Sequence, residues 1–112
     1  MDMTFYRVAS LSEAPPNAMK AFTISGREIL VANINGNLYA IDNRCSHRKG
    51  DLSKGVIDGT TVTCPVHGSK FDLSSGKALS GPKFGPIKLK TSDLNSYKVK
   101  VEEGSIMVEL PE

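Results

Sequence analysis

The sequence predicts a small all-β fold, a sandwich or barrel of short antiparallel strands. Short runs of β-branched and aromatic residues alternate with turn residues along most of the chain, which is typical of such folds. The pair Asn35-Gly36 lies between two of these runs and indicates a tight hairpin, because both residues readily adopt positive φ angles. The single helical candidate, residues 11–20, is interrupted by Pro15 and Pro16.

The expected elements follow from local pattern. Strands are predicted at residues 5–9, 19–24, 28–34, 38–41, 60–63, 70–73, 87–91, 97–102 and 105–110, with a shorter segment at 55–57. The turn Ser25-Gly26 divides the second strand from the third. Residues 97–101 alternate between polar and apolar, which indicates a strand with one wet face. Residues 11–16 and 81–86 are expected to be loops, and 93–96 a single turn.

Length predicts one domain over residues 1–112, since 112 residues is a common size for a single domain. Hydrophobic residues make up 39% and charged residues 23%, which excludes disorder, collagen and coiled coil as the main class. Between about residues 43 and 84 the apolar pattern fades and glycine, serine and charge dominate. We expect this stretch to be a loop-rich subdomain inserted in a β framework.

Charge and hydropathy exclude several classes of partner. The net charge of +2 is too even to favour nucleic acid or an anionic membrane. No apolar run approaches the roughly 20 residues of a membrane helix. The first residues lack the basic and apolar regions of a signal peptide, so the expected location is cytoplasmic.

The main functional clue is the position of the cysteines and histidines. The chain has two of each, arranged as Cys45-Ser46-His47 and, 16 residues later, Cys64-Pro65-Val66-His67. Each pair offers one thiolate and one imidazole from a single short loop, so two loops facing each other can bind one metal centre.

Several kinds of site fit these four residues. Two sulfur and two nitrogen ligands suit zinc or an iron–sulfur cluster. Structural zinc usually takes both thiolates from one Cys-x₂₋₄-Cys loop, whereas here each loop carries one cysteine and one histidine. That distribution favours a binuclear cluster. A mononuclear zinc site, a Cys45–Cys64 disulfide and two buried free cysteines with incidental histidines remain the alternatives.

These two boxes resemble those of the Rieske proteins. Leu52 and Gly55 follow the first box where that family has a leucine and a glycine, and the stretch 64–72 resembles the second box. Gly76 and then Gly81-Pro82 resemble the glycine turn and proline loop that cover the cluster. The resemblance spans nearly the whole chain and implies a small antiparallel β fold with a loop-rich cluster-binding subdomain.

The resemblance implies one Rieske-type [2Fe–2S] cluster bound by Cys45, His47, Cys64 and His67. In this family two histidines replace two cysteines on one iron, which raises the potential to about −150 to +300 mV from about −400 mV. Two neutral imidazoles in place of two thiolates remove two negative charges, so adding an electron costs less. The surrounding residues expected to tune the cluster are Arg48, Lys49, Gly68, Ser69, Phe71 and Pro82.

Ser69 matches a serine that donates a hydrogen bond to cluster sulfur in high-potential relatives, whereas Phe71 replaces a tyrosine that does the same. Ordinary turn and core roles are the alternatives for these two residues. The resemblance therefore implies a low-to-middle potential, on the order of −150 to +50 mV. Basic residues flank both boxes and form either a docking collar or scattered solvated charges: Arg44, Arg48, Lys49 and Lys70.

The implied function is that of a Rieske-type ferredoxin, a one-electron carrier between a flavin-dependent reductase and a terminal oxygenase. The chain is expected to be an electron-transfer protein rather than an enzyme, since no histidine is left for a mononuclear iron. It also lacks the extra cysteine pair of the cytochrome bc-complex subunit; Lys49 or its neighbour and Val66 occupy those positions. The alternatives are a small Rieske-like subunit of a larger oxidoreductase, such as assimilatory nitrite reductase, and a zinc-stabilised interaction module.

Overall fold

The computed structural model describes residues 2–46, 50–66, 68–80, 83–84, 87–88 and 91–111, with the backbone alone at 83–84 and 87–88. In these residues the fold is all-β, as the sequence predicts, with two short 3₁₀ helices. The strands are β1 (Met3–Ser10), β2 (Ala18–Ile24), β3 (Arg27–Ile34), β4 (Asn37–Asp42), β5 (Val56–Asp58), β6 (Thr61–Thr63), β7 (Lys70–Asp72), β8 (Ala78–Ser80), β9 (Lys83–Phe84), β10 (Ile87–Lys88), β11 (Ser96–Tyr97), β12 (Val99–Glu102) and β13 (Ser105–Pro111). The 3₁₀ helices are η1 (Leu11–Glu13) and η2 (Leu52–Lys54).

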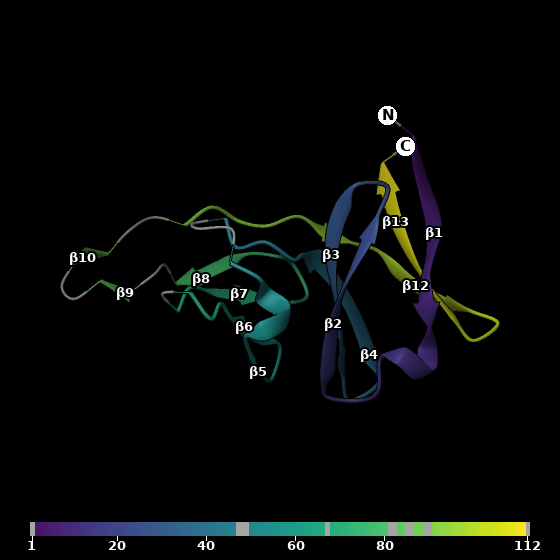
Figure 1. Ribbon diagram of the computed structural model, residues 1–112, viewed down its shortest axis with the longest axis horizontal. Helices are drawn as coiled ribbons and strands as arrows, with labels where there is room; N and C mark the ends of the chain where they lie inside the picture. Colours follow the sequence, from purple (N-terminus) through teal and green to yellow (C-terminus); the bar gives the residue numbers. More distant parts are fainter. Residues whose placement is uncertain are drawn as a thin grey trace.

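Two sheets form the framework, and a third carries the cysteine of the second box. The framework sheets have the orders β1-β13-β12 and β11-β4-β3-β2, and the third sheet is the meander β5-β6-β7-β8. The described strands pair antiparallel throughout. Figure 1 shows the framework on one side of the molecule and the β5–β8 sheet on the other, with the two ends of the chain side by side.

β3 lies between two apolar cores. Its residues from Ile29 to Ile34 are all buried, so both faces of this strand are covered. Ile29 and Val31 pack with Ile106 and Val108 of β13 inside the framework. The opposite face of β3 packs toward the β5–β8 sheet in a core that contains Leu30, Ile41, Leu52, Val62, Phe71 and both cysteines. The continuous apolar run of β3 is therefore the contact between the two halves of the molecule.

Both predicted hairpin turns are confirmed. Ser25 and Gly26 have φ angles of 50° and 78°, and Asn35 and Gly36 have φ angles of 54° and 94°. Two successive residues with positive φ give the turn whose twist matches that of the flanking strands. The two turns connect β2 to β3 and β3 to β4, so the register of this sheet is determined locally.

Some predictions near the loops were wrong. The expected loop at 11–16 begins with η1, where the Ser10 N–H donates to Glu13 Oε2 at 2.8 Å and caps the helix. The expected loop at 81–86 contains β9, which pairs with β10. The strand predicted at 97–102 divides into β11 and β12, and β8 was not predicted. Of the strand predicted at 87–91, Ile87 and Lys88 form β10, and residues 89–90 lie outside the described residues.

The single turn expected at 93–96 does not form. Asp93 Oδ1 accepts the Ala78 N–H at 2.8 Å, and the Leu94 N–H donates to the Gly76 carbonyl at 2.8 Å. The Asn95 N–H donates to Asp42 Oδ2 at 2.9 Å. These groups bond to distant segments rather than to one another, which takes the place of a local turn. Within the described ranges, no helix is long and apolar enough to cross a membrane.

Candidate metal centre

Cys45 and Cys64 lie side by side in the core between the framework and the β5–β8 sheet. Each is 1% exposed, and neither forms a disulfide. Their side chains are in hydrogen-bonding contact, although 18 residues separate them in the sequence. The fold thus brings the cysteines of the two sequence boxes together at one buried point.

The first loop, residues 43–53, is closed by a short antiparallel ladder that we call the neck. The Leu52 N–H donates to the Asn43 carbonyl at 2.9 Å, and the Cys45 N–H donates to the Gly50 carbonyl at 2.9 Å. Between these two hydrogen bonds, Arg44 and Asp51 form an isolated antiparallel bridge. Cys45 is therefore the last residue held by the neck before the tip of the loop.

The second loop, residues 63–70, is the connection between β6 and β7. Thr63 pairs with Lys70, and the Cys64 N–H donates to the Ser69 carbonyl at 2.7 Å. The Val66 N–H turns back toward the Cys64 sulfur at 3.4 Å. Gly68, with a φ angle of 77°, provides a positive-φ position just before Ser69. Here too the backbone N–H of the cysteine donates to a carbonyl on the opposite side of the loop.

Two glycines allow the loops to approach each other. A Cβ on Gly50 would lie 2.6 Å from the Cys64 sulfur, and a Cβ on Gly55 would lie 2.0 Å from the Thr63 carbonyl oxygen. Gly55 ends η2 on the outgoing side of the first loop, whereas Thr63 immediately precedes Cys64. The leucine and glycine noticed in the sequence thus have a packing role: Leu52 is fully buried in the core and Gly55 permits backbone contact between the loop bases.

Burial controls the electrostatics of the thiols. Burial raises the pKa of the Cys64 thiol, the Val66 N–H opposes that shift, and the neighbouring Cys45 raises the pKa further. Two adjacent buried thiolates are unfavourable unless a cation compensates them, and a coordinated metal supplies that charge. The pair is therefore suited to metal binding and unsuited to an exposed nucleophilic role.

Ser69 and Phe71 flank Cys64 inside the core. Ser69 is fully buried, and its hydroxyl has no hydrogen-bond partner in the part of the chain that the structure describes. A buried hydroxyl without a partner is unfavourable, so this one is available to donate to a group at the cysteines. Phe71 is also fully buried and packs in the same core as both cysteines. This agrees with a packing role for Phe71.

Five of the predicted site residues lie outside the residues that the structure describes: His47, Arg48, Lys49, His67 and Pro82. Within the described ranges, no three His, Cys, Asp or Glu residues come together as a metal site.

Of the described members of the expected basic collar, Lys70 is exposed and Arg44 is bound to Glu28. Arg44 Nε and Nη2 donate to the Glu28 carboxylate at 2.9 and 3.2 Å. The hydrogen bond from Arg44 lowers the pKa of Glu28, and the one from Asn43 adds to it.

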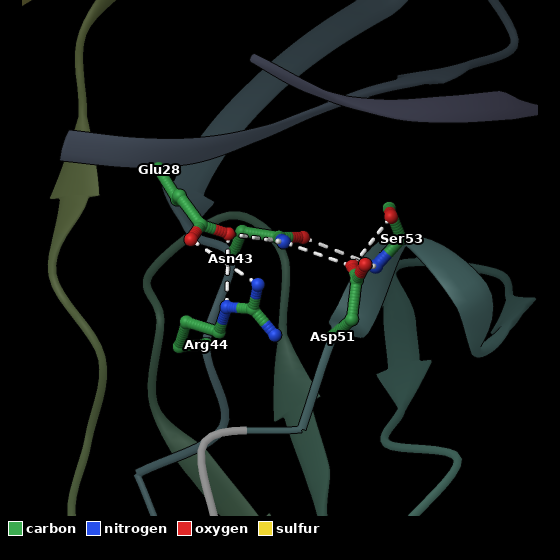
Figure 2. A network of polar contacts seen from close by, with 5 residues as sticks. All are labelled: Glu28, Asn43, Arg44, Asp51 and Ser53. Atoms are coloured by element: carbon green, nitrogen blue, oxygen red, sulfur yellow. Dashed lines mark hydrogen bonds and ion pairs between the residues drawn. The ribbon is translucent and has the colours of Figure 1, made fainter. Parts of the chain in front are cut away.

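Sequence reasoning missed a polar network beneath the first loop. It consists of Glu28, Asn43, Arg44, Asp51 and Ser53, and Figure 2 shows these side chains directed toward one another. Asn43 is completely buried at its centre. Its sequence signal is weak, because a single asparagine after a strand is equally typical of an exposed turn.

Comparison with known proteins gives consistent results. A family model described as the Rieske [2Fe-2S] domain matches residues 4–98. The ferredoxin component of the naphthalene 1,2-dioxygenase/salicylate 5-hydroxylase systems of a Ralstonia species is 31% identical over 110 residues, covering 98% of this chain and 99% of that protein.

Solved structures agree with the sequence comparisons. The ferredoxin of carbazole 1,9a-dioxygenase from Nocardioides aromaticivorans IC177 superposes with a TM-score of 0.79 at 32% identity, covering 97% of this chain and 99% of that one. A chain in a complex of reduced oxygenase and oxidized ferredoxin of carbazole 1,9a-dioxygenase has a TM-score of 0.75 at 27% identity, covering 93% of this chain and 91% of that one.

Proposed function

The chain belongs to the Rieske [2Fe-2S] domain family and carries the cluster of that family, and from this premise we propose that Cys45, His47, Cys64 and His67 are the ligands. Two observations on the described residues support the proposal. Cys45 and Cys64 are buried in contact with each other at equivalent positions of the two loops. The Ser69 hydroxyl is buried without a partner in the described structure, in the residue whose carbonyl accepts the Cys64 N–H, and it fits a donor to cluster sulfur.

The protein is a one-electron carrier and not itself a catalyst, like the ferredoxin components it resembles. When bound, the cluster stores and releases a single electron. The residues around it supply charge and shielding: Cys45 and Cys64 bind as thiolates, and Phe71 and Leu52 keep water from the sulfur side. His47 and His67 bind as imidazoles. We propose that residues 43–84 form the cluster-binding subdomain of a single domain over 1–112.

The proposed partners are a flavin-dependent reductase as electron donor and a terminal oxygenase as acceptor. The relatives named above are components of dioxygenase systems, and one solved complex pairs such a ferredoxin with an oxygenase. We also propose a cytoplasmic location, because a reducing compartment keeps Cys45 and Cys64 available as ligands instead of oxidising them to a disulfide.

Metal and sulfide content tests the cluster first. Anaerobically purified protein is analysed for iron, zinc and acid-labile sulfide, and its EPR spectrum is recorded after reduction with dithionite. Two irons and two sulfides per chain with a Rieske-type signal are expected. One zinc without sulfide would contradict the proposal and favour a zinc-stabilised module.

His67→Cys tests the ligand set. If His67 binds iron, a cysteine there adds a negative charge at the cluster, and the variant that retains a [2Fe–2S] cluster has a lower potential. Protein-film voltammetry measures the change, and Lys70→Cys, which adds a thiol at an exposed site, is the control. An unchanged potential in a cluster-loaded His67→Cys protein would exclude His67 as a ligand.

Electron transfer to the proposed partners is tested by mixing the protein with each of them and following the reaction. Reduced protein is mixed with an oxygenase component in a stopped-flow instrument, and separately the oxidised protein is mixed with NADH and a flavin reductase. Rapid exchange in both directions, followed by dissociation on a sizing column, is expected of a mobile carrier. Permanent co-elution with one larger oxidoreductase would instead favour the subunit alternative.

A further inference from the structure

Asn43 is a buried polar residue whose side-chain donor and acceptor are both hydrogen-bonded at the base of the first loop. Its side-chain Nδ2 donates to Asp51 Oδ1 at 2.9 Å and to Glu28 Oε2 at 3.4 Å, and its Oδ1 accepts the Ser53 N–H at 3.0 Å. Its backbone N–H donates to the Glu28 carbonyl at 3.1 Å, and its carbonyl accepts the Leu52 N–H at 2.9 Å. One side chain and its own backbone therefore join three segments of the chain (Figure 2).

These contacts hold both sides of the neck. Asn43 begins the incoming side, and Asp51 and Ser53 belong to the outgoing side. Asp51 is itself held in place, because its Oδ1 also accepts the Ser53 N–H at 3.1 Å and the Ser53 hydroxyl. Two residues beyond Asn43, the neck ends at the hydrogen bond from Cys45 to Gly50. The position of the Cys45 backbone is therefore determined by a ladder whose base is Asn43.

The same network attaches the neck to the framework. Glu28 lies in β3, the strand that is buried on both faces, and it contacts Asn43 through backbone and side chain. Arg44 completes the attachment through its paired hydrogen bonds to the Glu28 carboxylate. In the described part of the second loop, Cys64 extends directly from the β6–β7 hairpin and its hydrogen bonds involve Ser69 and Val66 of the same loop. The relative position of the two cysteines thus depends on how the first loop is fixed to β3.

We propose that Asn43 is the positioning residue of the cluster site: it acts through the neck to fix Cys45 against Cys64, and it does not touch the cluster. The inference rests on the proposed ligand set. A hydrogen-bonded side chain that is itself fully buried, as Asn43 is, fixes the segments it joins, whereas an apolar replacement removes its bonds to the half-buried Asp51, Ser53 and Glu28. Loss of Asn43 therefore loosens the first loop and speeds the loss of iron.

Asn33 provides a matched control. It is the other buried asparagine of the described structure, 5% exposed, and it too holds a turn through its side chain. Its Nδ2 donates to the Ala14 carbonyl at 2.7 Å, and its Oδ1 accepts the Gly36 N–H at 2.8 Å. Asn33 lies at the β3–β4 turn of the framework, at the opposite end of β3 from Glu28. Asn43→Ala and Asn33→Ala remove the same neutral side chain from two buried networks.

The experiment compares iron release from the loaded proteins to a ferrous chelator, together with the reduced EPR line width. Asn43→Ala is expected to release iron about 10-fold faster than wild type, as is typical when a residue behind metal ligands is lost. Its EPR signal is expected to broaden. Asn33→Ala is expected to stay within about twofold of wild type after both variants are compared at equal distance from their urea midpoints.

Hydrogen exchange read by mass spectrometry gives a second readout that does not depend on electron transfer. Faster exchange in residues 43–53 is expected in Asn43→Ala and not in Asn33→Ala. If Asn43→Ala does not fold, Asp51→Ala removes one partner of Asn43, and Asp72→Ala is its control, since Asp72 accepts from Ser74 in the same way.

Equal iron release and equal exchange in the paired variants would overturn the inference. Absence of a cluster from the wild type would instead overturn the proposed ligand set, while the exchange measurement would still report on Asn43.

Discussion

The two loops that carry the cysteines reach the same geometry by different means. In both, the backbone N–H of the cysteine donates across the loop, from Cys45 to the Gly50 carbonyl in one loop and from Cys64 to the Ser69 carbonyl in the other. The second loop is the end of a regular hairpin whose strands bury Val62 and Phe71 in the core. The first loop has no flanking hairpin strands and is closed by hydrogen bonds centred on the buried Asn43.

Because of this difference, the two loops should be sensitive to different kinds of substitution. Apolar packing responds to changes in side-chain volume, because a cavity or a clash in the core costs free energy. A polar network responds to the loss of one partner, which leaves a buried donor or acceptor unsatisfied at about 1–3 kcal/mol. The first loop should therefore respond to changes in hydrogen bonding, and the second to changes in volume and to the polarity at Ser69.

Gly55→Ala is expected to have the largest effect on stability and cluster content, because the added methyl group forces the bases of the two loops apart. Its Cβ would lie 2.0 Å from the Thr63 carbonyl oxygen, which is backbone and cannot rotate away. We expect a loss of about 3 kcal/mol or more and little retained cluster, since overpacking at a rigid contact forces the backbone apart. Urea unfolding and iron content measure both effects.

Gly59→Ala is the control for Gly55→Ala. Gly59 has a φ angle of 58° but no atom within 4 Å of an added Cβ, so its substitution causes strain without a clash. We expect a cost of about 1–2 kcal/mol and a full complement of iron. Equal loss of iron in the two variants would show that the contact between the loop bases does not determine cluster binding.

Much of this comparison was accessible from the sequence, but unequally. The strands β6 and β7, although not their pairing, were predicted because β-branched Thr61 and Val62 and the run 70–73 carry a local strand signal. The turns at Ser25-Gly26 and Asn35-Gly36 were predicted because their chemistry is local. The pairing of Cys45 with Cys64 followed from the repeated spacing, and the structure brings these two residues together.

The neck of the first loop was not predictable in the same way. Asn43 contacts Glu28, Asp51 and Ser53, and nothing in the sequence between residues 28 and 53 indicates which polar residues are partners. The arrangement of residues 93–95 was missed for the same reason, because its hydrogen bonds go to Gly76, Ala78 and Asp42. Local pattern identifies turns and strands, whereas polar contacts between distant segments depend on the assembled fold.

Ser69→Ala is expected to have the next largest effect, on the reduction potential. If the buried Ser69 hydroxyl donates to cluster sulfur, its removal destabilises the reduced, more negative state. A hydrogen bond to a charged group contributes about 1.5–3 kcal/mol, and tenfold in a one-electron equilibrium is about 59 mV. We therefore expect the potential to fall by on the order of 65–130 mV in voltammetry.

Ser46→Ala is the matched change in the first loop. The Ser46 hydroxyl is already bonded within the chain, since it donates to the Ser92 carbonyl at 2.6 Å. Its removal is expected to change the potential by less than about 20 mV while costing about 1 kcal/mol of stability. A larger shift for Ser46→Ala than for Ser69→Ala would reverse the assignment of the two serines.

Phe71→Tyr is expected to raise the potential by a smaller amount, on the order of 50 mV, because the added hydroxyl is a second donor in the core that contains the cysteines. The fully buried site has little spare volume, so the variant is also expected to lose about 1–3 kcal/mol of stability. Phe22→Tyr, in the framework core, is the control and leaves the potential unchanged. A potential that stays constant in Phe71→Tyr would place its hydroxyl out of reach of the cluster.

Asp51→Asn is expected to have the smallest effect, a loss of neck stability that depends on pH. Hydrogen bonds from the Ser53 side chain, and then from Asn43, lower the pKa of Asp51. A lowered carboxylate pKa adds stability above the ordinary value of about 4, and this stability is lost as the pH falls through the lowered pKa. The Asp51 carboxylate therefore stabilises the neck at neutral pH and ceases to do so in acid.

At pH 7 the neck is expected to be slightly less stable in Asp51→Asn than in wild type, and this difference in stability is expected to shrink toward zero as the pH falls below about 4. Hydrogen exchange of the metal-free proteins over residues 43–53, with residues 61–72 as internal reference, measures it without interference from the acid sensitivity of iron–sulfur clusters. In the described part of the second loop, Cys64 is held by its N–H bond to the Ser69 carbonyl and by the Val66 N–H at its sulfur. Neither bond involves a carboxylate, so exchange in this loop should not differ between the proteins at any pH. A loss of neck stability that stays constant with pH would mean that the shape of the Asp51 side chain, and not its charge, closes the first loop.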